Sequence, residues 1–283
     1  MTRGRKAGSP LVYGRGLFME FNDKKIVITG ASSGIGLELL KELAAVPGTQ
    51  IAGVARHTDA IAELGLPGVT ALSYDMSGPG HIDAMLGEAL RLLGRIDVFF
   101  ANAGFAYYGE ANTADWTRTQ DIFAVNTYAP IYTLQKLAAL QKGMSFSYVV
   151  TDSALAKAAI PGFAYYSATK YALDGFFEAY RYEQPHDITL SVVYPVATKT
   201  NFFKRAADAA PLPFPTQTPV EVARAVIRGV RRKRKKIYPF ASFGFFNWLW
   251  NFLPFLKSGY LALENNKFQK WRKRQQNKRR DRE

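Results

Sequence analysis

Runs of consecutive apolar residues alternate with amphipathic stretches over most of the chain. The apolar runs predict strands at 26–29, 51–55, 69–74, 96–101, 146–150 and 188–194. Apolar positions at helical spacing predict helices at 35–46, 80–93, 115–141, 164–182 and 218–232. Continuous apolar strands separated by helices indicate a parallel sheet covered on both faces. Right-handed crossovers then give a doubly wound α/β fold, in which ligands bind at the carboxyl ends of the strands.

A glycine-rich turn follows the first predicted strand. It reads Gly30-Ala31-Ser32-Ser33-Gly34-Ile35-Gly36 and leads directly into a helix. Free N–H groups and the helix dipole at such a helix start favour a phosphate group. The glycine spacing differs by one residue from the common dinucleotide fingerprint, and glycine-rich loops also close ordinary strand-to-helix turns. The turn alone is therefore a weak signal for a phosphate site.

Polar residues follow the later strands at the same predicted edge of the sheet. They are Asp75, Asn102, Ser153 and, at the start of the next helix, Tyr166 and Lys170. Tyr166 and Lys170 are four residues apart and share one helix face. An ammonium beside a phenol should lower the phenol pKa from about 10. Such a tyrosine can exchange a proton with a carbonyl oxygen, which the Ser153 hydroxyl could hold in place.

Taken in order, these segments resemble the classical short-chain dehydrogenases/reductases. The matching pieces are Thr29 to Gly36, Asp75, Asn102-Ala103-Gly104, Asn126, Ser153, Tyr166-x-x-x-Lys170 and Pro195 to Thr200, within about residues 22–235. The resemblance implies a Rossmann fold with Tyr166 as general acid/base and Lys170 as its activator and ribose ligand. It also implies that Ser153 orients the substrate oxygen and that Asn126 supports a water-mediated proton relay behind Lys170.

The same resemblance implies the residues that bind a nicotinamide dinucleotide. They are Gly30, Ser32, Ser33, Gly34, Ile35, Gly36, Arg56, Asp75, Asn102, Ala103, Gly104, Tyr166, Lys170, Pro195, Val196, Thr198 and Thr200. Val196 departs from the family, which usually has glycine after the proline. Thr151 is a weaker alternative to Ser153. Tyr165 lacks the four-residue spacing to Lys170 and is expected to pack or to line the substrate pocket.

The end of the second predicted strand bears on the choice between NAD and NADP. An NAD site usually has an acidic residue there to hold the ribose 2′-hydroxyl. This chain has Arg56 instead, twenty residues after Gly36. A guanidinium suits a 2′-phosphate, so we predict NADP(H). The alternative is that Arg56 is a solvated loop cation.

Charge is concentrated at the two ends of the chain. The formal net charge is +14, and 17 Lys/Arg against 3 Asp/Glu lie from Arg228 onward. Residues 1–18 add four basic residues and no acid, so the middle is mildly acidic. Without cysteine there is no disulfide framework, and the three histidines have no metal-ligand spacing. The basic ends could attract nucleic acid, but no nucleic-acid-binding fold accompanies them, and we expect no such partner.

Residues 237–256 carry no charge and are rich in aromatic side chains. Nine of these twenty residues are aromatic, and basic clusters flank the segment. Twenty residues could span a bilayer, but Pro239, Gly244 and Pro254 interrupt them, and aromatic residues prefer the interface. We therefore predict a segment that lies in the membrane surface. The alternative is that these aromatics cover the substrate pocket or a dimer contact.

The sequence predicts four regions. These are a disordered basic tail at 1–18, a catalytic domain at 19–236, an apolar appendage at 237–266 and a basic tail at 267–283, disordered from about residue 272. Met19 could be the natural start, and nothing before it reads as a secretory signal. Residues 205–219 are expected to form a loop, either a substrate-side flap or a surface connection.

The functional expectation is an NADP(H)-dependent oxidoreductase for a carbonyl or secondary alcohol of a lipid-like substrate. It would be cytoplasmic, with peripheral contact to the cytoplasmic face of a membrane through 237–263. The relatives suggest a homodimer paired through the helices at 115–141 and 164–182. The alternatives are a soluble reductase of small carbonyls and a catalytically idle NADP-binding membrane scaffold.

Overall fold

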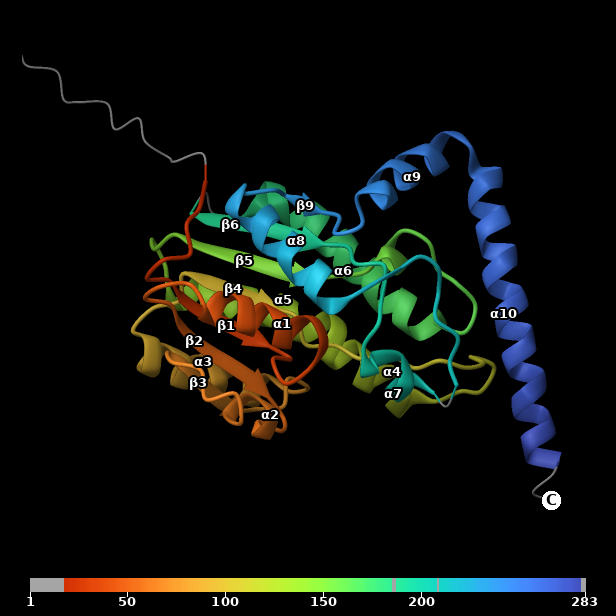
Figure 1. Ribbon diagram of the computed structural model, residues 1–283, viewed down its shortest axis with the longest axis horizontal. Helices are drawn as coiled ribbons and strands as arrows, with labels where there is room; N and C mark the ends of the chain where they lie inside the picture. Colours follow the sequence, from red (N-terminus) through yellow and green to blue (C-terminus); the bar gives the residue numbers. More distant parts are fainter. Residues whose placement is uncertain (1–17, 185–186, 208, 281–283) are drawn as a thin grey trace, which may run out of the picture.

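A computed structural model describes residues 18–184, 187–207 and 209–280, and its centre is one parallel sheet (Figure 1). The strands are β1 (Lys25–Thr29), β2 (Gln50–Ala55), β3 (Val69–Ser73), β4 (Val98–Ala101), β5 (Phe146–Thr151), β6 (Ile188–Val193) and β9 (Lys236–Ile237). Their order is β3-β2-β1-β4-β5-β6-β9, and every pairing is parallel. The predicted doubly wound fold is confirmed. Strands are added in one direction from β1 to β3 and in the opposite direction from β4 onward, so the strand order reverses between β1 and β4. Doubly wound folds bind ligands at such a point.

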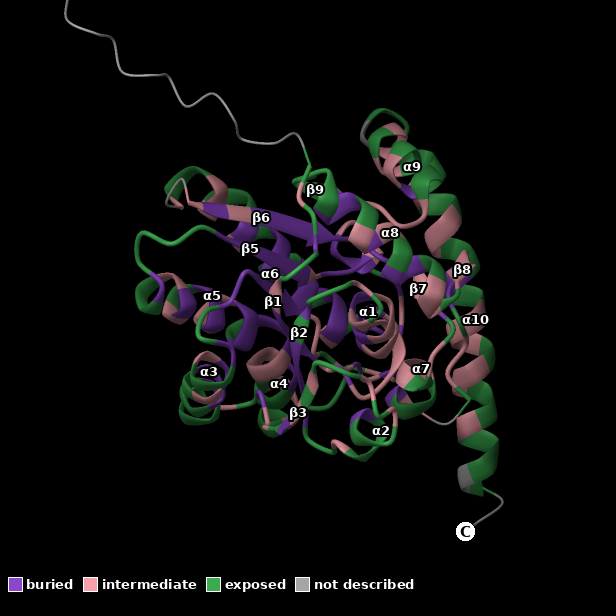
Figure 2. Cartoon of the chain, turned by 60° about the vertical axis from the view of Figure 1, so that its left-hand side comes forward, coloured by how far each residue is buried: buried purple, intermediate pink, exposed green. Residues whose placement is uncertain are grey.

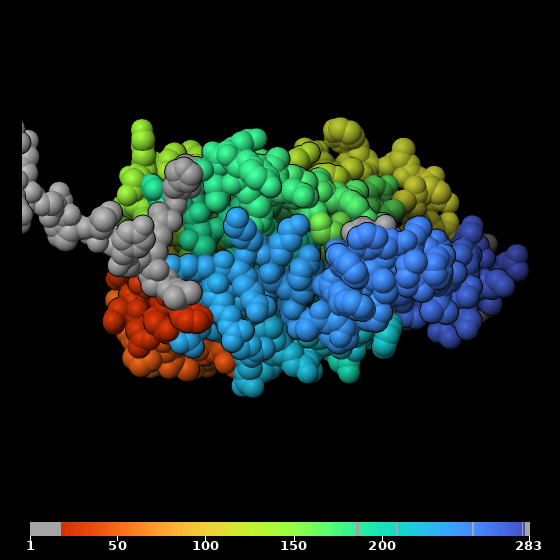
Figure 3. Space-filling model, turned by 90° about the horizontal axis from the view of Figure 1, so that it is seen from above, coloured from red at the N-terminus to blue at the C-terminus, as the bar shows by residue number. Residues whose placement is uncertain are grey.

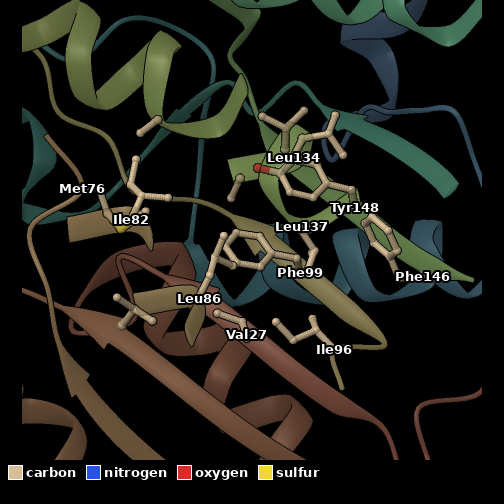
Figure 4. Packing of buried hydrophobic residues seen from close by; sticks show 14 of the residues in the cluster. Val27, Met76, Ile82, Leu86, Ile96, Phe99, Leu134, Leu137, Phe146 and Tyr148 are labelled. Atoms are coloured by element: carbon tan, nitrogen blue, oxygen red, sulfur yellow. The ribbon is translucent and has the colours of Figure 1, made fainter. Parts of the chain in front are cut away.

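Helices cover both faces of this sheet. They are α1 (Gly34–Ala44), α2 (Asp59–Ala62), α3 (Pro79–Leu93), α5 (Ala129–Leu140), α6 (Ala164–Glu183) and α8 (Pro219–Arg231). One core cluster joins α1 and α8 to the sheet, and the other joins α3, α5 and α6 to its opposite face. In the second cluster, Phe99 of β4 stacks on Tyr148 of β5 with ring centroids 5.3 Å apart (Figure 4). The Tyr148 hydroxyl donates to the Pro130 carbonyl at 2.7 Å, so this buried polar atom is satisfied.

The prediction of a single helix over 115–141 is wrong in one respect. It is divided into α4 (Trp116–Phe123), a π-helical turn η1 (Ala124–Tyr128) and α5. Pro130 has no N–H, so it cannot donate to the Asn126 carbonyl as an α-helix would require. The Ala129 N–H instead reaches back five residues to the Ala124 carbonyl. Asn126 lies in this turn, and π-helical turns are frequent at functional sites.

The segment after β6 is more ordered than the predicted loop. It contains β7 (Ala197–Thr198), α7 (Asn201–Ala206) and β8 (Thr216–Gln217), and β8 pairs with β7. The Thr200 hydroxyl accepts from the Phe202 N–H at 3.2 Å and caps α7. We call residues 209–215, which connect α7 to β8, the proline flap.

The C-terminal appendage consists of α9 (Ala241–Phe252) and α10 (Pro254–Arg280), which leave the sheet and run down one side of the domain (Figure 1). α10 crosses the predicted boundary at 266/267. The disordered ending predicted from residue 272 is wrong as far as Arg280, because the helix continues there, and 281–283 lie outside the described residues. Trp271 packs edge-on against Tyr108 at 4.9 Å, which holds this part of α10 to the domain.

The predicted disordered tail at 1–18 lies, apart from Phe18, outside the described residues. Among the helices that the structure describes, none is both long enough and apolar enough to cross a membrane.

Candidate functional site

A cavity of about 1200 Å³ opens at the carboxyl ends of the strands, and we call it the central cavity. Nearly all of the predicted site residues line it. They are Gly30, Ser32, Ser33, Gly34, Ile35, Arg56, Asp75, Asn102, Ala103, Gly104, Ser153, Tyr166, Lys170, Pro195, Val196, Thr198 and Thr200. Gly36 and Asn126 do not line the cavity.

The glycine turn is shaped by close backbone contacts. Gly30 and Gly34 have φ values of +68° and +58°, which side-chain-bearing residues rarely adopt. A Cβ at Gly36 would lie 2.3 Å from the Gly30 carbonyl oxygen. The Thr29 hydroxyl accepts from the backbone N–H groups of Asn102 and Ala103 at 3.0 and 3.1 Å. The first strand, the glycine turn and the Asn102 loop are thereby held together.

The glycine turn and the start of α1 fit the pyrophosphate of a dinucleotide. The turn places the N-terminus of α1 at the cavity wall, Gly36 has no Cβ to push against the Gly30 carbonyl and the Asn102 side chain, and the first turn of α1 carries no acid. Helix N–H groups can therefore bind a pyrophosphate without repulsion. Asp75, expected at the adenine, accepts from the Ser77 N–H at 2.9 Å, which stabilises the loop after β3.

The proposed catalytic side chains are buried together. Ser153, Tyr166 and Lys170 are 8%, 8% and 3% exposed. The Lys170 ammonium donates to the Thr151 carbonyl at 2.8 Å and lies 5.6 Å from the centre of the Tyr166 ring. The Ser153 hydroxyl accepts from the Leu155 N–H at 3.1 Å and also hydrogen-bonds Tyr166. The three groups form one polar cluster inside an apolar wall.

The predicted lowering of the Tyr166 pKa is not what the structure shows. Burial raises the pKa of Tyr166, the hydrogen bond with Ser153 lowers it, and the negative charge of Asp152 raises it further. Burial also lowers the pKa of Lys170, which the charge of Asp152 opposes. Desolvation disfavours both the phenolate and the ammonium. Tyr166 is therefore held as a neutral phenol with a proton to donate.

Asn126 supports the cluster from η1. Its side-chain oxygen accepts from the Phe105 N–H at 3.0 Å, and its amide donates to the Phe105 carbonyl at 2.8 Å and to the Thr169 hydroxyl at 3.2 Å. These bonds fix the loop after β4 to α6, which carries Tyr166 and Lys170. The relay role that the resemblance implies for Asn126 stays a prediction.

Contacts distinguish Ser153 from its alternative Thr151, and Tyr166 from its neighbour Tyr165. The Thr151 hydroxyl donates to the Asn102 side chain at 3.2 Å, whereas the Ser153 hydroxyl bonds Tyr166. Tyr165 is absent from the cavity lining and packs near Arg118, whose guanidinium lies 5.4 Å from its ring centre. The geometry therefore favours Ser153 and Tyr166.

Arg56 lies at the exposed rim of the cavity after β2. Its backbone carbonyl accepts from the Ser73 hydroxyl at 3.1 Å, which fixes this part of the chain. Among the described residues, no carboxylate forms an ion pair with its guanidinium. The guanidinium is therefore available to an anionic group in the cavity.

Aromatic side chains from four elements also line the cavity, and the sequence had indicated only part of them. They are Phe202 and Phe203 of α7, Phe214 of the proline flap, Phe246 and Trp250 of α9 and Tyr260 of α10. The Phe202 ring lies 5.5 Å from the Tyr166 ring. The Tyr260 hydroxyl donates to the Phe214 carbonyl at 3.0 Å and ties α10 to the flap. The many aromatic residues of 237–256 had suggested part of this wall, but no sequence pattern pointed to Phe202 or Phe203.

Comparisons with known proteins agree with this geometry. The family description "short chain dehydrogenase" matches residues 24–210. The 11-beta-hydroxysteroid dehydrogenase 1A of Arabidopsis thaliana is 28% identical over 236 residues, which cover 76% of this chain and 67% of that protein. A short-chain dehydrogenase from Sphingobium yanoikuyae, solved in complex with NADPH, is 25% identical with a TM-score of 0.70 and covers 84% of this chain and 95% of its own.

A further structure supports the fold alone. It is a short-chain dehydrogenase/reductase from Burkholderia phymatum, solved in complex with NAD, with a TM-score of 0.73 and 19% identity. It covers 84% of this chain and 96% of its own. Proteins similar to this chain therefore bind either nicotinamide dinucleotide.

Proposed function

The chain belongs to the short-chain dehydrogenase/reductase family, and from that premise we propose an NADP(H)-dependent oxidoreductase for the carbonyl or secondary alcohol of an apolar, lipid-like substrate. The observation that carries the proposal is the position of Tyr166. It lines the same cavity as the glycine turn and the aromatic side chains of α7, the proline flap, α9 and α10. A nicotinamide cofactor, when bound, supplies or accepts the hydride. The chain's own residues position the substrate and move the proton.

Each catalytic residue has a defined role in this proposal. The neutral Tyr166 phenol donates its proton to the developing alkoxide during reduction and accepts it during oxidation. Ser153 donates a hydrogen bond to the same substrate oxygen. Lys170 stabilises the phenolate that remains on Tyr166 and holds the ribose. The glycine turn, Asn102 to Gly104 and Pro195 to Thr200 hold the rest of the dinucleotide.

The apolar substrate is inferred from the cavity wall. Rings from α7, the proline flap, α9 and α10 line the cavity together with Tyr166, and burial of apolar surface against them favours a large hydrophobic ligand. A panel of carbonyls graded by chain length, followed by NADPH consumption, tests this. The proposal expects kcat/KM to rise with length, and a preference for the shortest carbonyls would favour the small-carbonyl alternative.

We expect Arg56→Ala to lower kcat/KM for NADPH about 10- to 100-fold and to leave kcat/KM for NADH nearly unchanged. A hydrogen bond to a charged group contributes about 1.5–3 kcal/mol, and only NADPH carries the 2′-phosphate. The control is Arg91→Ala, which removes an exposed arginine of α3 outside the cavity. Equal losses with both cofactors, or an NADH preference in the unsubstituted chain, would remove the NADP assignment.

The membrane-facing part of the proposal concerns the outer side of α9. Phe245, Phe246, Trp248 and Phe252 of α9 and Phe255 at the start of α10 are between 45% and 65% exposed. α9 lies at the surface of the molecule next to α10 (Figures 2 and 3). Basic residues precede this aromatic patch at 231–236 and follow it on α10. Aromatics at the headgroup level together with flanking cations suit a shallow contact with anionic lipid. Phe246 also lines the central cavity, so the patch and the substrate space adjoin.

Replacing both Trp248 and Phe252 by serine should weaken binding to phosphatidylcholine vesicles that contain phosphatidylserine by at least about tenfold, since each buried ring contributes about 1.5–3 kcal/mol. Vesicle flotation measures the bound fraction. The matched control replaces Trp116 and Tyr182, which are 80% and 91% exposed on α4 and α6. Unchanged flotation of the α9 variant would exclude the lipid contact and favour a scaffold or dimer role for the patch.

Two finer points belong to the same proposal. A peripheral position on the cytoplasmic face follows from the basic flanks, which favour anionic lipid.

A homodimer through α4, α5 and α6 is supported by exposed apolar side chains there, among them Leu140 and Tyr171. Light scattering in solution measures the oligomer directly.

A further inference from the structure

One face of α10 is hydrogen-bonded to the proline flap by three side chains. Tyr260, Glu264 and Lys267 follow one another at spacings of four and three residues, so they lie on one side of the helix. The Tyr260 hydroxyl donates to the Phe214 carbonyl at 3.0 Å, and the Phe214 N–H donates to the Glu264 carboxylate at 3.3 Å. The Lys267 ammonium donates to the Leu212 carbonyl at 3.4 Å and to the Glu264 carboxylate at 2.7 Å. We call these three side chains the α10 clamp.

The proline flap depends on such partners because it has few backbone donors. Three of its seven residues are proline, namely Pro211, Pro213 and Pro215. Proline has no N–H, so the flap cannot form a continuous backbone ladder with a neighbouring strand. Both backbone polar groups of Phe214 are bonded to α10 instead. The position of this part of the flap therefore depends on the α10 clamp.

Glu264 links the position of the flap to a buried charge. It is 5% exposed, and its carboxylate accepts from the Phe214 N–H and forms an ion pair with Lys267. A buried carboxylate that loses a donor pays the cost of desolvation without compensation. Movement of the flap away from α10 would take one donor from Glu264, so the observed position of the flap is favoured.

The α10 clamp acts on the wall of the central cavity. Residues 213–215 line this cavity, and so does the Tyr260 ring, which stacks on Trp250 of α9 with ring centroids 5.7 Å apart. Tyr260 thus joins two parts of the wall, α9 and the flap. Glu264 and Lys267 are not among the lining residues. They therefore act on a molecule in the cavity through the flap rather than by contact with it.

We propose that the α10 clamp determines the preference for long apolar substrates by fixing the proline flap in the cavity wall, with Glu264 and Lys267 as positioning residues. The inference rests on the proposed function, since it names what sets the substrate preference of that site. A wall that is already fixed does not have to be ordered when the substrate binds, which improves affinity. A longer substrate buries more surface against this wall, so it gains more from the fixed flap than a short carbonyl does.

The first test compares Glu264→Ala with the unsubstituted chain on the series of carbonyls graded by length. KM for the longest carbonyls should rise about tenfold, the lower end of what a bond to a charged group contributes. The kcat should stay within about twofold, because the flap contributes to binding and not to the proton transfer. KM for the shortest carbonyl should be nearly unchanged. Equal losses at all lengths, or no loss at any length, would overturn the proposal.

Two further variants show whether the bond itself matters. Glu264→Gln keeps a side-chain oxygen that can accept from the Phe214 N–H, so KM for the longest carbonyls should stay within about threefold of the unsubstituted chain. The control is Glu38→Ala, because Glu38 of α1 also pairs with a lysine three residues later, Lys41, and lies outside the cavity lining. It should leave the length preference unchanged. A Glu264→Gln variant as impaired as Glu264→Ala would contradict the role of the bond to the flap.

The second test needs no turnover. Hydrogen exchange followed by mass spectrometry reports on the flap, whose exchangeable amides are those of residues 209, 210, 212 and 214. Exchange at Phe214 should become at least about tenfold faster in Glu264→Ala, because its N–H loses the acceptor. Tyr260→Phe removes one hydroxyl and keeps the ring in the wall, so it tests the α10 clamp even if the Glu264 variant does not fold. It should also speed exchange of the flap, by about threefold.

The two tests separate the clamp from the proposed function. Unchanged exchange in Tyr260→Phe and in the Glu264 variant overturns the α10 clamp, whatever the chain catalyses. If the unsubstituted chain reduces no carbonyl, the proposed function fails, and exchange alone decides whether α10 holds the flap. If the enzyme is active and exchange becomes faster while the length preference stays the same, only the assignment of substrate preference to the clamp fails.

Discussion

Tyr166→Phe is expected to lower kcat about 10²- to 10⁴-fold, the contribution of a positioned general acid or base. The substitution removes one hydroxyl and keeps the ring, whose neighbours Phe163 and Phe202 lie 6.3 and 5.5 Å away between ring centres. The packing around the site should therefore persist. NADPH consumption with the best substrate of the length series measures kcat, and quenching of protein fluorescence by NADPH measures cofactor affinity.

The affinity of Tyr166→Phe for NADPH shows whether a loss of activity comes from the missing proton donor or from a disturbed site. Loss of the proton donor should leave the dissociation constant of NADPH within about threefold, because the hydroxyl is a small part of a long binding surface. Tyr165→Phe is the matched control, since Tyr165 is adjacent in sequence and lies outside the cavity lining. Turnover that survives in Tyr166→Phe, or is lost equally in Tyr165→Phe, would exclude Tyr166 as the acid. A chain with no turnover before substitution would instead support the idle scaffold.

The sheet and the catalytic edge were predictable because their signals are local. Apolar runs locate the strands, and the carboxyl ends of parallel strands meet at one edge, so Asn102, Ser153 and Tyr166 had to converge. Even the strand limits agree within about two residues. The π-helical turn at Asn126 was missed because it depends on one absent N–H in Pro130, which a helical apolar pattern does not reveal.

What the sequence left open depends on packing between distant segments. The aromatics of 237–256 were predicted to face either lipid or the pocket. The structure divides them, with Phe243 buried and Trp250 in the cavity wall, whereas Trp248 and Phe252 remain exposed. The Tyr166 pKa was predicted in the wrong direction because spacing shows that Lys170 is near but not how dry the site is. Asp152 attracted no notice, since only its burial makes it unusual.

Gly36→Ala is expected to weaken NADPH binding at least about tenfold and to lower the free energy of unfolding by about 1–3 kcal/mol, the usual cost of overpacking. The added Cβ would lie 2.3 Å from the Gly30 carbonyl oxygen and 2.6 Å from the Asn102 side-chain nitrogen. The Gly30 atoms belong to the backbone, so the glycine turn has to move away from α1. That movement displaces the N–H groups that are proposed to hold the pyrophosphate.

The control for Gly36→Ala is Gly87→Ala in the middle of α3. A Cβ there meets nothing within 4 Å, and alanine favours a helix interior by up to about 1 kcal/mol, so stability should stay level or rise. Urea unfolding and NADPH titration of both variants separate the two effects. If Gly36→Ala binds NADPH as tightly as the unsubstituted chain while losing stability, the turn packs the domain without cradling the phosphates. The dinucleotide would then have to be held mainly by Arg56, Asn102 and Lys170.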